Sequence, residues 1–250
     1  MSRQASYQNF SSPDGVFAAM PNGKSHQHRD PLWFLLGASV LTIVLSALPL
    51  AGLIVYPIRL FVTFIHEGGH ALAAMLTLGQ VESIYIYPNA SGETYTRGGL
   101  QLFIASAGYL ASTVFGAALL ILGRHGKNAK PVLALNAGLI LALTAFFAGN
   151  LFSWGTGIIL TLGLISLAIW STPRIAHFLL SFLAVQCCLN AFLDLRTLFL
   201  ISATTNVHSD AAAMAQMTLI PATAWAVLWM VVSLIALVFA LRGYTRHLRP

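Results

Sequence analysis

Long apolar runs dominate this chain, and short polar segments separate them. A helix rises about 1.5 Å per residue, so about 20 apolar residues cross the ~30 Å hydrocarbon core of a bilayer. Within the runs, Pro57 is placed to begin a helix and Gly79 to follow the end of one. The pattern predicts an all-α polytopic membrane protein with about seven transmembrane helices, at residues 32–55, 57–78, 100–122, 131–147, 151–170, 174–202 and 221–241.

The composition supports this class, because 57% of the residues are hydrophobic and only 8% are charged. Soluble domains carry about 25% charged residues. The net charge of +6 therefore bears on membrane topology and does not indicate nucleic-acid binding. Residues 1–30 are polar without apolar periodicity and predict a disordered tail, and residues 243–250 form a basic tail. The transmembrane domain is expected to span residues 31–242.

A β-prone segment interrupts the helical pattern directly after the second predicted helix. Turn residues at 88–92 separate two short strand-like stretches, which predicts a β-hairpin over residues 81–97. One interpretation is an ordinary surface hairpin. The other is an edge strand that holds an extended substrate by strand addition, and the residues expected to do so are Ser83, Ile84, Tyr85, Ile86 and Tyr87.

The second predicted helix carries the sequence His66-Glu-Gly-Gly-His70, an HExxH motif. Histidines four residues apart leave the same face of a helix, a spacing that suits two nitrogen ligands on one Zn²⁺ ion. Glu67 is then placed to act as general base. Ionisable groups at membrane depth are costly, about 2.5–3.5 kcal/mol for a charged one, so they indicate a functional site. A chance match is the alternative, but the whole chain has only seven acidic residues.

A second polar site lies in the sixth predicted helix, where Asp194 follows Asn190 by four residues. A carboxylate within an apolar helix needs a partner, and a zinc ion on a neighbouring helix can provide one. We therefore expect Asp194 to be the third zinc ligand and Asn190 to orient its carboxylate. The alternative is an ion pair with Arg196, but residues two apart face different sides of a helix. Asp210 begins a later helix, where water and the helix dipole account for it, so it is not expected to bind the metal.

These motifs together resemble the site-2 protease family, the intramembrane zinc metallopeptidases, and in particular its short bacterial branch without a PDZ domain. The resemblance rests on His66-Glu-Gly-Gly-His70, the hairpin behind it, Ala107-Gly-Tyr109 and Leu189-Asn-Ala-Phe-Leu-Asp194-Leu. It implies one zinc ion held by His66, His70 and Asp194, with Glu67 as base. The family's Leu-Asp-Gly signature is Leu193-Asp-Leu here, which is the one departure.

The resemblance implies a metalloendopeptidase that hydrolyses a peptide bond in or near a membrane-spanning segment. Zinc would lower the pKa of water towards about 7, and Glu67 would take its proton. The expected partners are a membrane-protein substrate and the lipid bilayer, in regulated intramembrane proteolysis at the bacterial inner membrane. Two alternatives remain open: a membrane metal carrier or sensor that does not hydrolyse, and a degenerate peptidase that binds membrane segments without cutting them.

Two arguments about membrane orientation oppose each other. The basic connector 124–130 and the basic tail fall on one side of the membrane, which the positive-inside rule makes cytoplasmic. The resemblance implies instead that the hairpin, which lies on the opposite side, is cytoplasmic. Because the access side of a metal site is tied to its chemistry, we expect the orientation that the resemblance implies.

Overall fold

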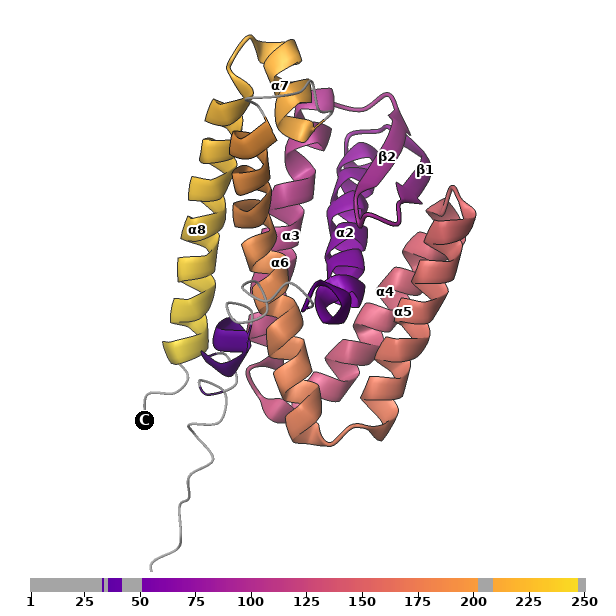
Figure 1. Ribbon diagram of the computed structural model, residues 1–250, viewed down its shortest axis with the longest axis vertical. Helices are drawn as coiled ribbons and strands as arrows, with labels where there is room; N and C mark the ends of the chain where they lie inside the picture. Colours follow the sequence, from indigo (N-terminus) through magenta and orange to yellow (C-terminus); the bar gives the residue numbers. More distant parts are fainter. Residues whose placement is uncertain (1–32, 34–35, 42–50, 202–208, 247–250) are drawn as a thin grey trace, which may run out of the picture.

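The computed structural model describes residues 33, 36–41, 51–201 and 209–246, of which the side chains of 51–54, 190–201 and 244–246 are not part of the description (Figure 1). The predicted polar tail 1–30, half of the predicted first helix 32–55 and the end of the basic tail lie outside these residues. The described part is helical except for one small hairpin. Its elements are α2 (Ala51–Leu76), β1 (Gln80–Ile86), β2 (Gly92–Arg97), α3 (Gln101–Gly123), a 3-10 turn (Gly126–Asn128), α4 (Ala129–Phe147), α5 (Leu151–Trp170), α6 (Pro173–Ile201), α7 (Asp210–Thr218) and α8 (Ala222–Arg246).

Four helices of the described part are long and apolar enough to cross a membrane. They cover Gln101–Gly123, Gly126–Phe147, Leu151–Trp170 and Ala222–Gly243. Many of their large apolar side chains are exposed, as expected for surfaces that face lipid rather than water. The helical membrane class is therefore supported, with four candidate spans among the described residues rather than the seven expected.

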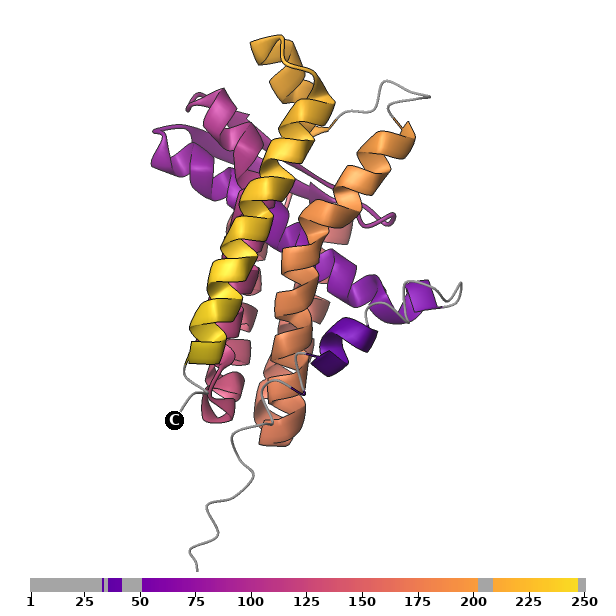
Figure 2. The ribbon, with the colours of Figure 1, turned by 90° about the vertical axis from the view of Figure 1, so that its left-hand side faces the viewer.

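Helix α3 lies at the centre of the bundle and packs against α2, α6 and α8, while α4 and α5 form a second pair (Figure 1). Small residues permit these close approaches. A Cβ added to Gly116 of α3 would lie 2.7 Å from the Ala184 carbonyl oxygen and from Cys188 Sγ of α6. Seen from the side, α2 crosses α6 and α8 obliquely (Figure 2). This crossing carries the middle of α2 past α3.

The predicted helix 57–78 is observed as α2 (Ala51–Leu76), which begins before Pro57 and ends two residues before the predicted end. Pro57 lies inside the helix and does not begin it. At the other end, Leu78 adopts a left-handed conformation (φ 62°), and the Gly79 amide donates to the Ala74 carbonyl over 2.8 Å. This is a Schellman-type end. A Cβ at Gly79 would lie 3.0 Å from the Gly99 nitrogen, so the glycine lets the chain after β2 return against the end of α2.

The predicted hairpin is present, and β1 and β2 pair antiparallel with Ile84 opposite Thr94 and Ile86 opposite Gly92. Side chains alternate across a strand. Ile84 and Ile86 are fully buried in the same apolar core as Phe61 and Phe64 of α2. The hairpin therefore lies with one face on the helix that carries the HExxH motif.

Candidate metal centre

Helix α2 places His66 and His70 one turn apart on the face that meets α3. Their Nε2 atoms are 3.1 Å apart, and the ring centroids are 4.8 Å apart. His70 Nδ1 lies 2.7 Å from the Ile104 carbonyl oxygen, which can only accept a hydrogen bond. This bond puts the proton on Nδ1 and leaves the Nε2 lone pair directed into the site. The His66 ring packs edge-on against Tyr109, with a centroid separation of 4.8 Å.

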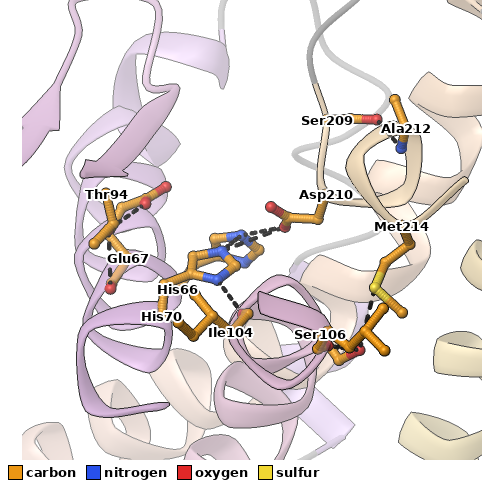
Figure 3. A network of polar contacts seen from close by, with 11 residues as sticks. His66, Glu67, His70, Thr94, Ile104, Ser106, Ser209, Asp210, Ala212 and Met214 are labelled. Carbon is orange, nitrogen blue, oxygen red and sulfur yellow. Dashed lines mark hydrogen bonds and ion pairs between the residues drawn. The ribbon is translucent and has the colours of Figure 1, made fainter. Parts of the chain in front are cut away.

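Asp210, the first residue of α7, brings a carboxylate to the same point (Figure 3). Its Oδ2 lies 3.1 Å from His66 Nε2 and 3.3 Å from His70 Nε2. Ligands held tetrahedrally at about 2.0–2.2 Å from Zn²⁺ lie roughly 3.3–3.6 Å from each other. The two histidine nitrogens and this oxygen therefore have nearly the mutual spacing of three zinc ligands. Among the residues that the structure describes, His66, His70 and Asp210 could together hold a metal ion.

The expectation that water and the helix dipole account for Asp210 is wrong. The cap of α7 is the preceding residue, Ser209, whose Oγ accepts a hydrogen bond from the Ala212 amide over 3.2 Å. The Asp210 carboxylate is thus free of capping and faces the histidines. Burial raises the pKa of the Asp210 carboxyl, but His70 and His66, when protonated on Nε2, outweigh burial through charge and hydrogen bonds and hold this pKa below its ordinary value.

Packing of α7 against the bundle brings Asp210 to α2, although 144 residues separate Asp210 from His66. Ala211 and Met214 are buried in a cluster with Tyr109 of α3 and Trp229 of α8. The Tyr109 and Trp229 rings stack at 5.1 Å. The apolar spacing of Ala211 and Met214 in a short helix was the available sequence signal for this docking.

The structure does not describe the side chains of the two predicted site residues in α6. Asp194 and Asn190 belong to that helix, but their side chains lie outside the described residues. Their roles as third ligand and orienting residue therefore stay predictions. Three protein donors are the usual set of a catalytic zinc site, and Asp210 is the candidate for the third of them among the described residues.

Gly108 of α3 leaves open the space in front of the histidines. A Cβ at this position would lie 2.5 Å from His70 Nε2 and from His66 Cε1, and closer still to His66 Nε2. A side chain at residue 108 would thus occupy the point on which the ligand atoms converge. This cradle is a second observation, beside the donor spacing, that fits a bound ion.

Glu67 is buried and lies on the hairpin side of the histidines, away from Asp210 in the view of Figure 3. Thr94 of β2 donates a hydrogen bond from Oγ1 to Glu67 Oε2 over 2.7 Å. Thr94 Oγ1 also lies 3.1 Å from the backbone carbonyl oxygen of Glu67. A Cβ at Gly92 would lie 2.7 Å from Glu67 Cγ and Oε1. The carboxylate is therefore held directly beneath β2.

The segment predicted to bind substrate, Ser83–Tyr87, covers the second half of β1 and the residue after it, and its outer edge is closed at two positions. The Ile84 carbonyl accepts from the Gly149 amide over 2.8 Å, and the Ile86 amide donates to Ser153 Oγ over 2.6 Å. Asn150 Nδ2 also donates to the Ile86 carbonyl over 3.2 Å. The loop between α4 and α5 and the first turn of α5 thus occupy this edge. The strand that faces Glu67 is β2, which the sequence pattern did not single out.

Comparison with known proteins agrees with the site. No curated protein and no solved structure gives a significant match to the chain. The profile of one family, described as Peptidase M50B-like, matches residues 36–240, which include α2, the hairpin and α7. This match confirms the resemblance to the site-2 proteases, and the chain belongs to the Peptidase M50B-like family.

Proposed function

We propose that this protein is a zinc-dependent intramembrane endopeptidase that cleaves membrane-protein substrates in or near a membrane-spanning segment. The observation that carries the proposal is the convergence of His66 Nε2, His70 Nε2 and Asp210 Oδ2 at 3.1–3.3 Å beside the buried Glu67. Membership of a peptidase family and four apolar helices support it. The structure holds these groups within a helical bundle, where an enzyme of this kind meets its substrate.

Each polar residue of the site has a role in this proposal. His66, His70 and Asp210 would hold the metal through one atom each. A zinc ion bound there would supply Lewis acidity toward the substrate carbonyl and would make water acidic enough to lose a proton near neutral pH. Glu67 accepts the proton of the attacking water and then delivers it to the nitrogen of the departing amine. Glu67 and His70 are buried, which limits the access of bulk water to these two groups.

The substrate must enter in an extended form, because the carbonyls of a helix are hydrogen-bonded within the helix. We place its binding along β2. Ile84 directs its carbonyl toward the α4–α5 loop, so the Ile84–Thr94 pair is a non-hydrogen-bonded pair of the hairpin. The backbone N–H and C=O of Thr94 therefore point away from β1. An extended segment can pair with this edge by strand addition.

Replacing Glu67 with glutamine should abolish cleavage and leave the metal in place, because the carboxylate moves a proton and is not among the three converging donors. General acid–base groups contribute about 10²–10⁴-fold to rates. Cleavage of a fluorogenic single-span peptide in detergent, with zinc content measured on the same preparation, tests this. His66→Ala is the contrasting variant and should lose both metal and activity. Full cleavage by Glu67→Gln would overturn the proposed function, because the cleavage would not depend on this site. Absence of cleavage by the native protein would favour a metal carrier or a degenerate peptidase.

We also propose that the protein is a multi-pass protein of the bacterial inner membrane with the hairpin on the cytoplasmic side. Asn89 is exposed at the tip of the hairpin, and both native cysteines, Cys187 and Cys188, are buried. A cysteine at Asn89 should therefore resist an impermeant thiol reagent in intact cells and react after lysis. Lys127 is exposed in the α3–α4 connector, at the opposite end of the bundle (Figure 1), so Lys127→Cys should react in intact cells. The reverse pattern would contradict this orientation.

A further inference from the structure

Thr94 has contacts of two kinds, and they point in different directions. Its hydroxyl reaches down from β2 to Glu67, 2.7 Å from Oε2. Its backbone groups lie along the outer edge of β2, away from β1, as its pairing with Ile84 requires. Thr94 thus contacts the general base through its side chain, and its backbone forms part of the edge on which we place the substrate.

The hydroxyl is the group that fixes the Glu67 side chain. A threonine hydroxyl has one proton to donate, and a hydrogen bond to a carboxylate is stronger than one to a neutral carbonyl. The 2.7 Å contact to Oε2 is also shorter than the 3.1 Å contact to the Glu67 carbonyl. The proton therefore goes to the carboxylate. Gly92 completes the arrangement, because any Cβ there would displace the Glu67 side chain.

The hairpin does not depend on Thr94 for its attachment to α2. Tyr56 donates from its hydroxyl to the Pro88 carbonyl over 2.6 Å. Thr63 donates to the Ala90 carbonyl over 2.8 Å. The buried Ile84 and Ile86 hold the inner face against the core. Removing one hydroxyl at residue 94 therefore leaves the strand in position.

We infer that Thr94 is a positioning residue for the general base, which aims the Glu67 carboxylate from the strand that receives the substrate. The inference rests on the proposed function. It assigns the Thr94 side chain to turnover and the Thr94 backbone to substrate pairing. Base orientation and substrate binding therefore depend on the same strand but on separable atoms.

The test compares Thr94→Val, which has the same shape but no hydroxyl, with Thr94→Ser, which keeps the hydroxyl and loses the methyl group. With the fluorogenic single-span peptide, Thr94→Val should lower kcat about 10–100-fold, part of the full general-base contribution. KM should change less than about twofold, because the backbone edge is intact. Thr94→Ser should restore kcat to within about threefold of the native value. Zinc content should be native in both variants.

Thr161→Val in α5 is the matched control, because the buried Thr161 hydroxyl has no hydrogen-bond partner among the described residues. It should cleave like the native protein. Native kcat in Thr94→Val, or an equal loss in Thr94→Ser, would overturn the positioning role. A loss expressed mainly in KM would do so too, since it would assign Thr94 to substrate binding. The proposed function has its own test and fails if Glu67→Gln still cleaves. If Glu67→Gln is inactive while Thr94→Val is fully active, the proposed function stands and only the positioning role of Thr94 fails.

Discussion

Asp210→Ala should lose its zinc and all peptidase activity, since it removes one of three donors that lie 3.1–3.3 Å apart. The loss of affinity should exceed the ~10–100-fold that follows loss of a residue that only orients a ligand. Metal content after dialysis against a graded chelator, together with cleavage of the single-span peptide, measures both effects. Asp210→Asn should behave in the same way, because an amide of the same shape is a much poorer zinc ligand than a carboxylate.

Asp194→Ala is the decisive comparison for this assignment. With three donors already in place, it should retain zinc at native occupancy. Zinc retained by Asp210→Ala and lost by Asp194→Ala would reverse the assignment and restore the expectation from the sequence. A folding check by thermal unfolding belongs with both variants, since Asp210 begins the helix that packs on Tyr109 and Trp229.

Gly108→Ala should also prevent metal binding, although it adds only one methyl group. The new Cβ would lie 2.5 Å from His70 Nε2, in the space that a bound ion requires. Alanine is favoured over glycine within a helix by about 1 kcal/mol. The variant should therefore be folded but inactive, with zinc content near zero.

Gly138→Ala in α4 is the matched control, because a Cβ at that position meets no atom within 4 Å. It should keep native zinc content and cleavage. Zinc bound by Gly108→Ala at native stoichiometry would contradict the geometry of the cradle. Circular dichroism and thermal unfolding of both glycine variants separate loss of metal from loss of fold.

The parts of the structure that local patterns determine could be predicted from the sequence. Alternation and turn residues located the hairpin, and apolar runs located the helices that the structure describes. The HExxH spacing correctly predicted that His66 and His70 lie on one face of a helix, because four residues make about one turn. The prediction that a helix begins at Pro57 was wrong, since α2 begins earlier and continues through this residue.

The position of the Asp210 carboxylate beside the histidines could not be predicted, because it depends on how α7 packs. A sequence shows that Asp210 follows a capping serine, but not that Ala211 and Met214 dock against α3 and α8. The same limit applies to the hairpin. Alternation shows two strands, yet only the contacts of Gly149 and Ser153 show that the outer edge of β1 is occupied at Ile84 and Ile86. The sequence argument favoured Asp194 because it weighed the cost of an unpaired carboxylate within one helix. It took no account of the contacts that other helices make.

The long separation between the donors, 144 residues from His66 to Asp210, has a consequence for biosynthesis. A ribosome releases the HExxH helix early and the third donor only near the end of the chain. No nascent chain shorter than 210 residues contains the complete donor set. Under the proposed function, the metal site can therefore form only after most of the chain has been synthesised, and a shorter nascent chain would be unable to cleave its neighbours.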